Sequence, residues 1–221
     1  MEKTNKEIDL KQYIEHTLLK QEATLSEVEQ LCAEAVEHGF YGVCVPPYFV
    51  EAAVKFLNGA KPKVISVVGF PLGYNPISVK VEEAKKAFER GAHEVDMVMN
   101  IAAFKSGDFN QVKNDIESVT TIAHMQDKVV KVIIESGILS EKEINKACEI
   151  CAEAGVDFVK TSTGFAAAGA STEHIKMMRK LLPAKVKIKA SGGIKTHAQA
   201  MEMVEAGADR IGSSSGVKLL E

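Results

Sequence analysis

The sequence predicts an α/β fold, a single (β/α)8 barrel with a short N-terminal helix. Strand-like and helix-like segments alternate from one end of the chain to the other, and eight segments read as strands. Polar residues stand at many strand ends, and no Gly-x-Gly-x-x-Gly turn follows the first strand, which disfavours a doubly wound sheet. The length of 221 residues is close to that of such barrels, which is typically about 250 residues.

The expected strands are short apolar runs, and the expected helices are the amphipathic segments between them. The strands fall near 13–18, 41–45, 63–69, 94–99, 129–135, 156–161, 186–190 and 208–212. The helices fall near 24–38, 47–57, 78–90, 109–125, 140–154, 172–182 and 196–206.

Residues at the expected helix ends support these boundaries. Short polar side chains stand where N-caps belong, at Thr24, Ser78, Ser140 and Thr172. Glycine follows the last helical turn at positions 39, 59, 91, 155 and 207, where a left-handed cap favours it. Four of these glycines lie in Glu-His-Gly-Phe, Glu-Arg-Gly-Ala, Glu-Ala-Gly-Val and Glu-Ala-Gly-Ala, which indicates a repeated unit of helix, cap and strand.

Composition bounds the class of protein. Hydrophobic residues make up 46% and charged residues 26% of the chain, which fits one well-buried domain over residues 1–221 and no membrane span. Because the formal net charge is −3 and no basic run occurs, we expect no nucleic-acid partner. The first seven residues carry mixed charges and no apolar stretch, so we expect no signal peptide and a cytoplasmic location.

The four cysteines, Cys32, Cys44, Cys148 and Cys151, are expected to be reduced in a cytosolic domain of this size. Cys148 and Cys151 form a C-x-x-C motif, but they lie two turns into an expected helix, on one apolar face with Ile144. A redox motif belongs at a helix N-terminus, where the helix dipole lowers a thiol pKa. We therefore predict that both pack in the core. Cys44 is most simply a core residue too, although its place near a strand end leaves contact with a ligand open.

Two lysines at strand ends are the strongest candidates for chemistry. Lys160 ends the sixth expected strand before a small-residue loop, and Lys189 ends the seventh before a glycine pair. An isolated lysine has a pKa near 10.4, so only about 0.04% is free amine at pH 7. Lowering that pKa to about 7 takes about 4.6 kcal/mol, which burial and a second ammonium nearby can supply together. The pair therefore predicts an amine that attacks a carbonyl group.

Each lysine also has a structural interpretation, in which it only pairs with an inward carboxylate such as Asp96. We favour that interpretation for Lys131 and Lys187, and the chemical one for Lys160 and Lys189. The choice is open until the side chains are placed.

Strand alternation predicts which side chains enter the barrel. Val186 and Ile188 suit the face that packs against helices, which leaves Lys187 and Lys189 pointing inward. In a barrel the site forms at the C-terminal ends of the strands. Other polar side chains expected on the strands are Glu15, Asp96, Lys131 and Glu135.

Two loops rich in glycine and serine are candidates for binding phosphate. The segments Ser-Gly-Gly at 191–193 and Gly-Ser-Ser-Ser-Gly at 212–216 follow the seventh and eighth strands and offer backbone N–H groups and hydroxyls. Barrels often bind phosphate between these loops, beside a short extra helix that the segment 216–221 can form. Most loops of this composition are only turns, so the prediction depends on their position.

Six segments resemble those of the deoxyribose-phosphate aldolase family, and the resemblance covers nearly the whole chain. They are Ile-Glu-His-Thr-Leu-Leu at 14–19, Val-Gly-Phe-Pro at 68–71, Glu-Val-Asp at 94–96, Lys-Val-Ile-Ile-Glu at 131–135, Val-Lys-Thr-Ser-Thr-Gly-Phe at 159–165 and Lys-Ala-Ser-Gly-Gly-Ile at 189–194. The last two are the most specific. Their joint occurrence in this order is a strong signal.

The resemblance implies a class I aldolase that reversibly converts 2-deoxy-D-ribose 5-phosphate to acetaldehyde and D-glyceraldehyde 3-phosphate, without a metal or cofactor. It implies that Lys160 forms a Schiff base, that Lys189 perturbs its pKa and that Asp96 relays protons through water. The supporting residues it implies are Glu15, Thr17, Lys131 and Thr161, and the phosphate-binding residues are Gly164, Gly192, Gly193, Ser214 and Ser215. The sequence has no His-x-His or His-Glu-x-x-His motif, which agrees with a metal-free site. A homodimer or homotetramer is expected, with sugar phosphates and aldehydes as its small-molecule partners.

The chain departs from the family pattern in two places. Glu15 stands where the family usually has aspartate, and Ala-Ala-Ala-Gly-Ala-Ser at 166–171 replaces a more glycine-rich loop. Either difference can tune rate or specificity. Two other interpretations are another phosphate-binding barrel enzyme, such as an isomerase or a different Schiff-base aldolase, and a non-enzymatic sugar-phosphate sensor. A sensor does not need a reactive amine.

Overall fold

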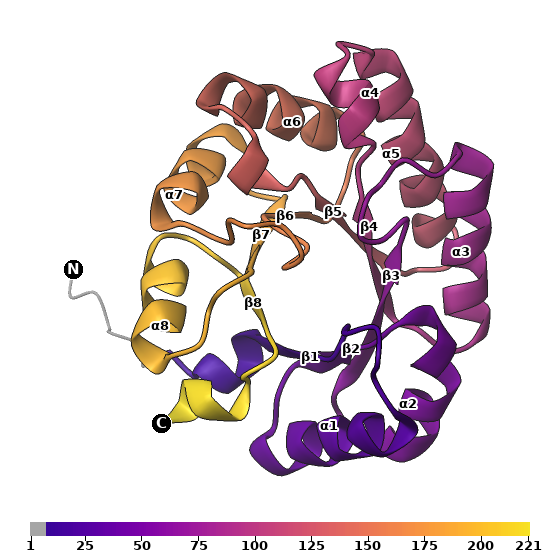
Figure 1. Cartoon of the computed structure of the whole chain (residues 1–221), viewed down its shortest axis with the longest axis vertical. Coiled ribbons are helices and arrows are strands. Elements are labelled where there is room, and N and C mark those ends of the chain that lie inside the picture. Colours follow the sequence, from indigo (N-terminus) through magenta and orange to yellow (C-terminus); the bar gives the residue numbers. More distant parts are fainter. Residues whose placement is uncertain (1–7) are drawn as a thin grey trace.

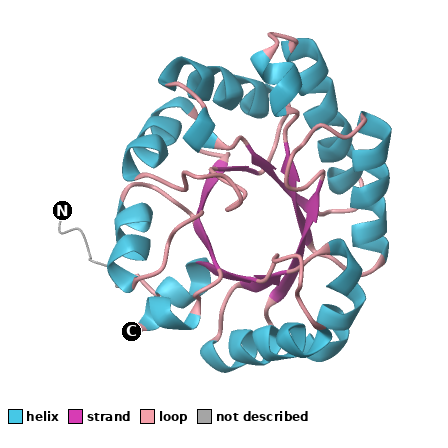
Figure 2. Cartoon of the chain, in the orientation of Figure 1, coloured by secondary structure: helices cyan, strands magenta, loops and turns pink. Residues whose placement is uncertain are grey.

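Eight parallel strands close into a barrel, and the helices form a ring around it (Figures 1 and 2). The computed structural model describes residues 8–221. Each strand pairs with the one before it in the chain, and β8 (Arg210–Ser213) pairs with β1 (Ile14–Thr17) to close the ring. The predicted (β/α)8 barrel is confirmed. The mixed-charge segment 1–7, on which the expectation of no signal peptide rests, lies outside the described residues.

Every expected strand and helix has a counterpart in the structure. The remaining strands are β2 (Gly42–Cys44), β3 (Lys63–Val68), β4 (Glu94–Val98), β5 (Val129–Ile133), β6 (Phe158–Lys160) and β7 (Lys187–Ser191). The α-helices are α1 (Leu25–His38), α2 (Val50–Leu57), α3 (Ile77–Glu89), α4 (Ile101–Lys105), α5 (Phe109–His124), α6 (Glu141–Glu153), α7 (Thr172–Leu181) and α8 (His197–Glu205). Within this described part of the chain, every helix is too short or too polar to cross a membrane.

Capping residues fix several helix ends at the predicted positions. Thr24 and Ser140 accept hydrogen bonds from the backbone of Glu27 and Glu143, whose carboxylates bind back to them, so both form complete capping boxes. Gly39 ends α1 with a left-handed φ of 69°. The other four predicted glycines also have positive φ.

Two predicted N-caps are wrong by one or two residues. Helix α7 begins directly after Ser171, whose Oγ accepts a hydrogen bond from the N–H of His174 at 3.2 Å, so Thr172 is the first helical residue. Helix α3 begins directly after Pro76, whose carbonyl accepts the first hydrogen bonds of the helix. Ser78 therefore lies within the first turn.

The elements that the sequence pattern missed are short helices. Helix α4 has five residues and begins after Asn100, whose side chain accepts a hydrogen bond from the N–H of Ala103 at 3.0 Å. A helix this short cannot display a hydrophobic period. The expected N-terminal helix is the 3-10 helix η1 (Leu10–Tyr13), and the expected short helix after β8 is η4 (Val217–Leu220). Two further 3-10 helices are η2 (Pro47–Phe49) and η3 (Ser136–Ile138).

The barrel wall separates two kinds of interior. Apolar side chains fill the layer between the strands and the surrounding helices. Inside the ring, a small apolar cluster of Cys44, Ile65 and Val67 lies beside buried charged side chains. Most of the buried charged side chains therefore lie on the inner side of the barrel.

Alternation along β7 shows how a lysine enters the barrel. Ile188 and Ala190 belong to the outer core, and Lys189 between them points into the barrel, as predicted. Lys187 also follows this alternation, with its Nζ 5.6 Å from the centre of the Phe158 ring. Lys187 is exposed, however, because it lies at the N-terminal start of the strand.

One charged pair is buried outside the barrel, between α3 and α5. Lys80 Nζ donates to Asp115 Oδ2 at 2.5 Å and to the carbonyl of Val98 at 2.8 Å, and both charged side chains are buried. Burial lowers the pKa of Lys80 and raises that of Asp115. The pair ties two helices to the end of β4, and each charge depends on the other.

The cysteines in the described part of the chain are free and buried. Cys148 and Cys151 pack in the core on α6, as predicted, and burial raises the pKa of Cys148 to about 12. Cys44 lies inside the barrel, where burial raises its pKa to about 11. These thiols are neutral at physiological pH.

Candidate active site

Three lysines and three carboxylates meet inside the barrel, and all six side chains are buried. They come from five strands, at positions whose side chains face the axis. We call this group the axial cluster; its members are Glu15, Glu94, Asp96, Lys131, Lys160 and Lys189. Each charge contacts at least one of opposite sign, which offsets the loss of hydration. The structure thus brings together five residues predicted from the sequence and adds Glu94.

Asp96 holds two lysines on one oxygen. Lys160 Nζ donates to Asp96 Oδ2 at 2.7 Å, and Lys189 Nζ donates to the same oxygen at 2.6 Å. The two lysines are also direct partners in the register of β6 and β7. Two amines this close disfavour each other's protonation.

The two lysines differ in their readiness to lose a proton. Burial lowers the pKa of Lys160, and the nearby Lys189 ammonium lowers it further, against the opposing effect of Asp96. Burial also acts against the charge of Lys189, but Asp96 and Glu15 outweigh it and raise the pKa of Lys189. Lys160 therefore loses its proton more readily than Lys189 does.

Asp96 is the common partner of the three lysines. Burial acts to raise the pKa of Asp96, but Lys131, Lys160 and Lys189 outweigh it and lower that pKa well below its ordinary value. The carboxylate is therefore ionised.

Lys131 is held by carboxylates from two strands. Its Nζ contacts Glu94, Asp96 Oδ1 at 3.0 Å and Glu15 Oε1 at 3.5 Å. Burial opposes its charge, but these carboxylates raise the pKa of Lys131 well above its ordinary value. Lys131 thus follows the structural interpretation that the sequence favoured for it.

Glu15 connects the two charged lysines of the cluster. Its Oε2 accepts a hydrogen bond from Lys189, and its Oε1 faces Lys131 without a hydrogen bond of its own. The longer side chain at this position therefore still presents a carboxylate to Lys189.

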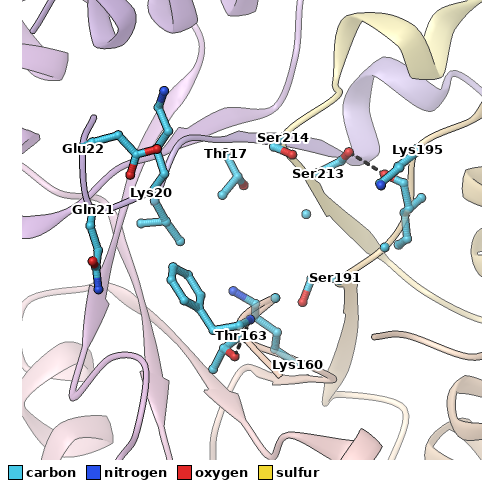
Figure 3. Close-up of a pocket in the computed structure, with 17 residues that line it drawn as sticks. Thr17, Lys20, Gln21, Glu22, Lys160, Thr163, Ser191, Lys195, Ser213 and Ser214 are labelled. Atoms are coloured by element: carbon cyan, nitrogen blue, oxygen red, sulfur yellow. Dashed lines mark hydrogen bonds between the residues drawn. The ribbon is translucent and has the colours of Figure 1, made fainter. Parts of the chain in front are cut away.

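An open cavity of about 560 Å³ lies at the C-terminal ends of the strands. Of the three lysines in the axial cluster, Lys160 alone lines it, and Figure 3 shows its side chain among the residues that surround the space. Its walls come from the loops that follow β1, β6, β7 and β8. The predicted residues that line it besides Lys160 are Thr17, Gly164, Gly192, Gly193 and Ser214.

Two glycines after β7 shape one side of the cavity. Gly192 and Gly193 have φ of 89° and 79°, a conformation that favours glycine. A side chain at Gly192 would also place its Cβ 2.9 Å from the Cα of Gly169. Among the described residues, the N–H groups of both glycines donate no hydrogen bond, so they are free for a ligand. Lys195, which the sequence did not single out, also lines this side of the cavity.

The three serines at the C-terminal end of β8 are placed differently. Ser213 Oγ donates to the carbonyl of Ile194 at 2.7 Å, which joins the two loops (Figure 3). Ser214 lines the cavity. Ser215 does not line it; its N–H donates to Ser213 Oγ at 3.0 Å, and its carbonyl accepts from the N–H of Leu219 at 3.2 Å.

The two predicted supporting threonines also differ. Thr17 lines the cavity, and its Oγ1 donates to the carbonyl of Glu15 at 3.0 Å. Thr161 is fully buried; its Oγ1 donates to the carbonyl of Ser191 at 3.1 Å and accepts from the N–H of the same residue at 3.0 Å. Thr161 therefore fastens the end of β6 to the end of β7.

Glu135 positions the loop that follows Lys160. It has a positive φ of 53°, and its carboxylate accepts hydrogen bonds from the N–H of Thr163 at 3.2 Å and from Thr163 Oγ1 at 2.5 Å. Thr163 in turn accepts from the N–H of Phe165 at 3.1 Å, and the Phe165 ring packs edge-on against Phe70. The sequence singled out Glu135 by its position on a strand, but not its partners.

An accessible lysine of lowered pKa beside a lysine of raised pKa, at the C-terminal end of a barrel, is typical of one class of enzyme. Such enzymes bind a carbonyl compound as a Schiff base to lysine. The glycine-lined loops on the same side leave room for an anionic group.

The chain belongs to the DeoC/LacD aldolase family, whose model matches residues 7–220. It is 53% identical to the deoxyribose-phosphate aldolase of Thermococcus gammatolerans, over 97% of this chain and 96% of that protein. It is 54% identical to the enzyme of the same name from Thermococcus kodakarensis, over 96% of each. The solved deoxyribose phosphate aldolase from Aeropyrum pernix has 35% identity and a TM-score of 0.90, over 96% of this chain and 89% of that one. The family resemblance seen in the motifs is confirmed.

Proposed function

We propose that the protein catalyses the reversible cleavage of 2-deoxy-D-ribose 5-phosphate to D-glyceraldehyde 3-phosphate and acetaldehyde. The observation that carries this proposal is the shared oxygen of Asp96, which holds Lys189 as a cation beside Lys160 at the floor of the cavity. The curated relatives with more than half of their residues identical carry the name of this activity.

The reaction begins with the neutral amine of Lys160, which attacks the C1 aldehyde and forms a carbinolamine. Loss of water gives an iminium, which accepts the electron pair of the C2–C3 bond when a base removes the proton from the C3 hydroxyl. D-glyceraldehyde 3-phosphate leaves, and an enamine remains on Lys160. Protonation of the enamine at C2 and hydrolysis of the new iminium release acetaldehyde and restore the amine.

Asp96 and Lys189 serve the proton transfers in this scheme. Asp96 relays protons to and from Lys160 through water, since its ionised carboxylate lies 2.7 Å from Lys160 Nζ. Lys189 keeps Lys160 deprotonated between turnovers. Glu15 holds Lys189 in this position through its carboxylate.

The phosphate of the substrate binds at the glycine loop after β7 and the serine loop after β8. The free N–H groups of Gly192 and Gly193 and the exposed wall formed by Ser214 support this position. Lys195 adds a positive charge on the same wall. Ser215, by contrast, acts through its backbone, which supports the loop.

We also propose that the chain assembles as a homodimer or homotetramer in the cytoplasm. The relative from Aeropyrum pernix is described as a tetramer. Light scattering coupled to size exclusion measures the mass of the assembly, and a monomer at micromolar concentration contradicts the proposal.

The proposed reaction is tested by trapping. Acetaldehyde and borohydride should leave an ethyl group on Lys160, identified by peptide mass spectrometry, and a coupled assay should detect glyceraldehyde 3-phosphate from deoxyribose phosphate. Lys160→Leu should abolish both signals and leave the circular dichroism spectrum unchanged. A different Schiff-base aldolase would be trapped without cleaving this sugar, and a sensor would show neither signal.

A further inference from the structure

We propose that Glu94, at the opposite end of the barrel from the cavity, is a positioning residue that acts through Lys131 to set the charge balance around Lys160. The inference rests on the proposed function, in which Lys160 must be neutral to react. Glu94 is remote from the cavity: it begins β4, whereas Lys160 ends β6. It is buried, with 3% of its surface exposed.

Glu94 is held by groups that keep it charged and aimed at the axis. Its carboxylate contacts Lys131 on one side and accepts a hydrogen bond from the Tyr41 hydroxyl on the other. The guanidinium of Arg210 stacks on the Tyr41 ring, 3.5 Å from its centre. Burial acts to raise the pKa of Glu94, but Lys131 and Tyr41 lower it overall, so the carboxylate is ionised at neutral pH.

A chain of contacts carries the charge of Glu94 to the reacting amine. Glu94 contacts Lys131, Lys131 lies 3.0 Å from Asp96 Oδ1, and Asp96 Oδ2 lies 2.7 Å from Lys160. The links are ion pairs between buried groups, which solvent screens weakly. A change of charge at Glu94 therefore changes the pKa of Lys160.

Counting charges gives the direction of the effect. When Lys160 is neutral, the axial cluster holds two ammonium groups and three carboxylates, and the excess negative charge favours the return of a proton to Lys160. Without the charge of Glu94, two ammonium groups would face two carboxylates. Glu94 therefore raises the pH at which Lys160 becomes neutral, and Lys131 lowers it.

Other titratable groups around the cluster do not reverse this direction. Those that face Glu94, Lys131 or Lys160 from the packed strands are Glu15, Tyr41, Cys44, His93, Asp96, Lys187, Lys189 and Arg210. Burial raises the pKa of Tyr41 and of Cys44, so both stay neutral in the range where the amine is measured. Burial lowers the pKa of His93, whose Nδ1 accepts a hydrogen bond from the N–H of Val64, so its ring is neutral above about pH 7.

The test measures the protonation of Lys160 directly, without the enzymatic reaction. Formaldehyde and cyanoborohydride methylate a neutral amine, and peptide mass spectrometry gives the extent of methylation of Lys160 at each pH. Glu94→Gln should shift this titration to lower pH by about one unit, because a unit charge roughly 10 Å away at an effective dielectric constant of about 20 has that effect. Lys131→Met should shift it to higher pH. The two shifts have opposite signs, which a general loss of packing does not produce.

Matched variants complete the experiment. Glu94→Asp keeps the charge and should leave the titration unshifted, as should Glu149→Gln, which removes an exposed carboxylate from α6. The Glu94→Gln change is measured again in the Lys131→Met background, where it restores the charge balance and should return the titration toward the parent. This second comparison serves if Glu94→Gln alone fails to fold.

Two results overturn the inference: a Glu94→Gln titration that coincides with the parent, and a shift of the same sign in Glu94→Gln and Lys131→Met. Failure of the proposed function gives a result that differs from both of these. It shows as absent cleavage of deoxyribose phosphate by the parent protein, while the methylation of Lys160 still reports the effect of Glu94.

Discussion

Replacement of Lys189 by methionine tests the central electrostatic argument. Lys160 and Lys189 lie 2.7 Å and 2.6 Å from the same oxygen of Asp96, so their nitrogens are at most about 5.3 Å apart. At an effective dielectric constant of about 20, two unit charges at that distance repel by about 3 kcal/mol, or about 2 pKa units. Without Lys189 the pKa of Lys160 should rise by about that amount. Its neutral fraction at pH 7 should then fall about 100-fold.

The assay is the pH dependence of kcat/KM for cleavage, followed by coupled detection of glyceraldehyde 3-phosphate. The rate of Lys189→Met should be about 100-fold below the parent at neutral pH and should recover as the pH rises, because the amine is deprotonated again. Lys187→Met is the control, since Lys187 lies on the same strand at its exposed end. An acid limb at the same pH in Lys189→Met and the parent would refute the role of the second lysine.

Three further outcomes follow from the geometry. Gly193→Asp should raise KM for deoxyribose phosphate far more than for unphosphorylated 2-deoxyribose, because it puts a carboxylate beside the phosphate; equal losses on both sugars indicate a misfolded loop instead. Glu15→Asp should keep kcat within about tenfold, whereas Glu15→Gln should lose more, because a carboxylate is needed to hold Lys189 beside Asp96; parent-like activity of the Gln variant makes Glu15 a bystander. Lys80→Met should lower the free energy of unfolding by about 3 kcal/mol, since it leaves the carboxyl group of Asp115 buried without its partner, and urea titration should show a much smaller loss when Asp115→Leu is added.

The barrel itself was predictable because residue types at the ends of most of its units mark where helices begin or end. A polar cap before the helix and a glycine after it bracket the apolar runs, and closed packing of eight such units leaves few other arrangements. The sequence pattern did not reveal short helices such as α4, because five residues are too few to display a hydrophobic period. The cap of α3 was misplaced because the extended backbone of Pro76 starts that helix before the serine does.

The contacts between side chains inside the barrel were harder to predict than which side chains point into it. The inward positions of Lys160 and Lys189 follow from alternation, but which carboxylate each one contacts depends on the register between strands. Glu94 was visible only as part of a motif, since nothing in the sequence says that it reaches Lys131 rather than solvent. Ser214 and Ser215 are chemically identical neighbours, and only the turn after β8 decides which of them faces the cavity.

The depth of the axial cluster has a consequence for how the protein responds to salt. Mobile ions screen charges over about 8 Å at physiological ionic strength, but only where water and ions can reach. The six charges of the cluster are buried, with Lys160 alone at the cavity floor, whereas Gly192, Gly193 and Ser214 stand on its open wall. Added sulfate or phosphate should therefore compete for the substrate's anchoring site and raise KM, while the pH at which Lys160 loses its proton stays fixed. In the proposed reaction, one cavity thus joins a salt-sensitive end, which binds the phosphate, to a salt-insensitive end, which holds the reacting amine.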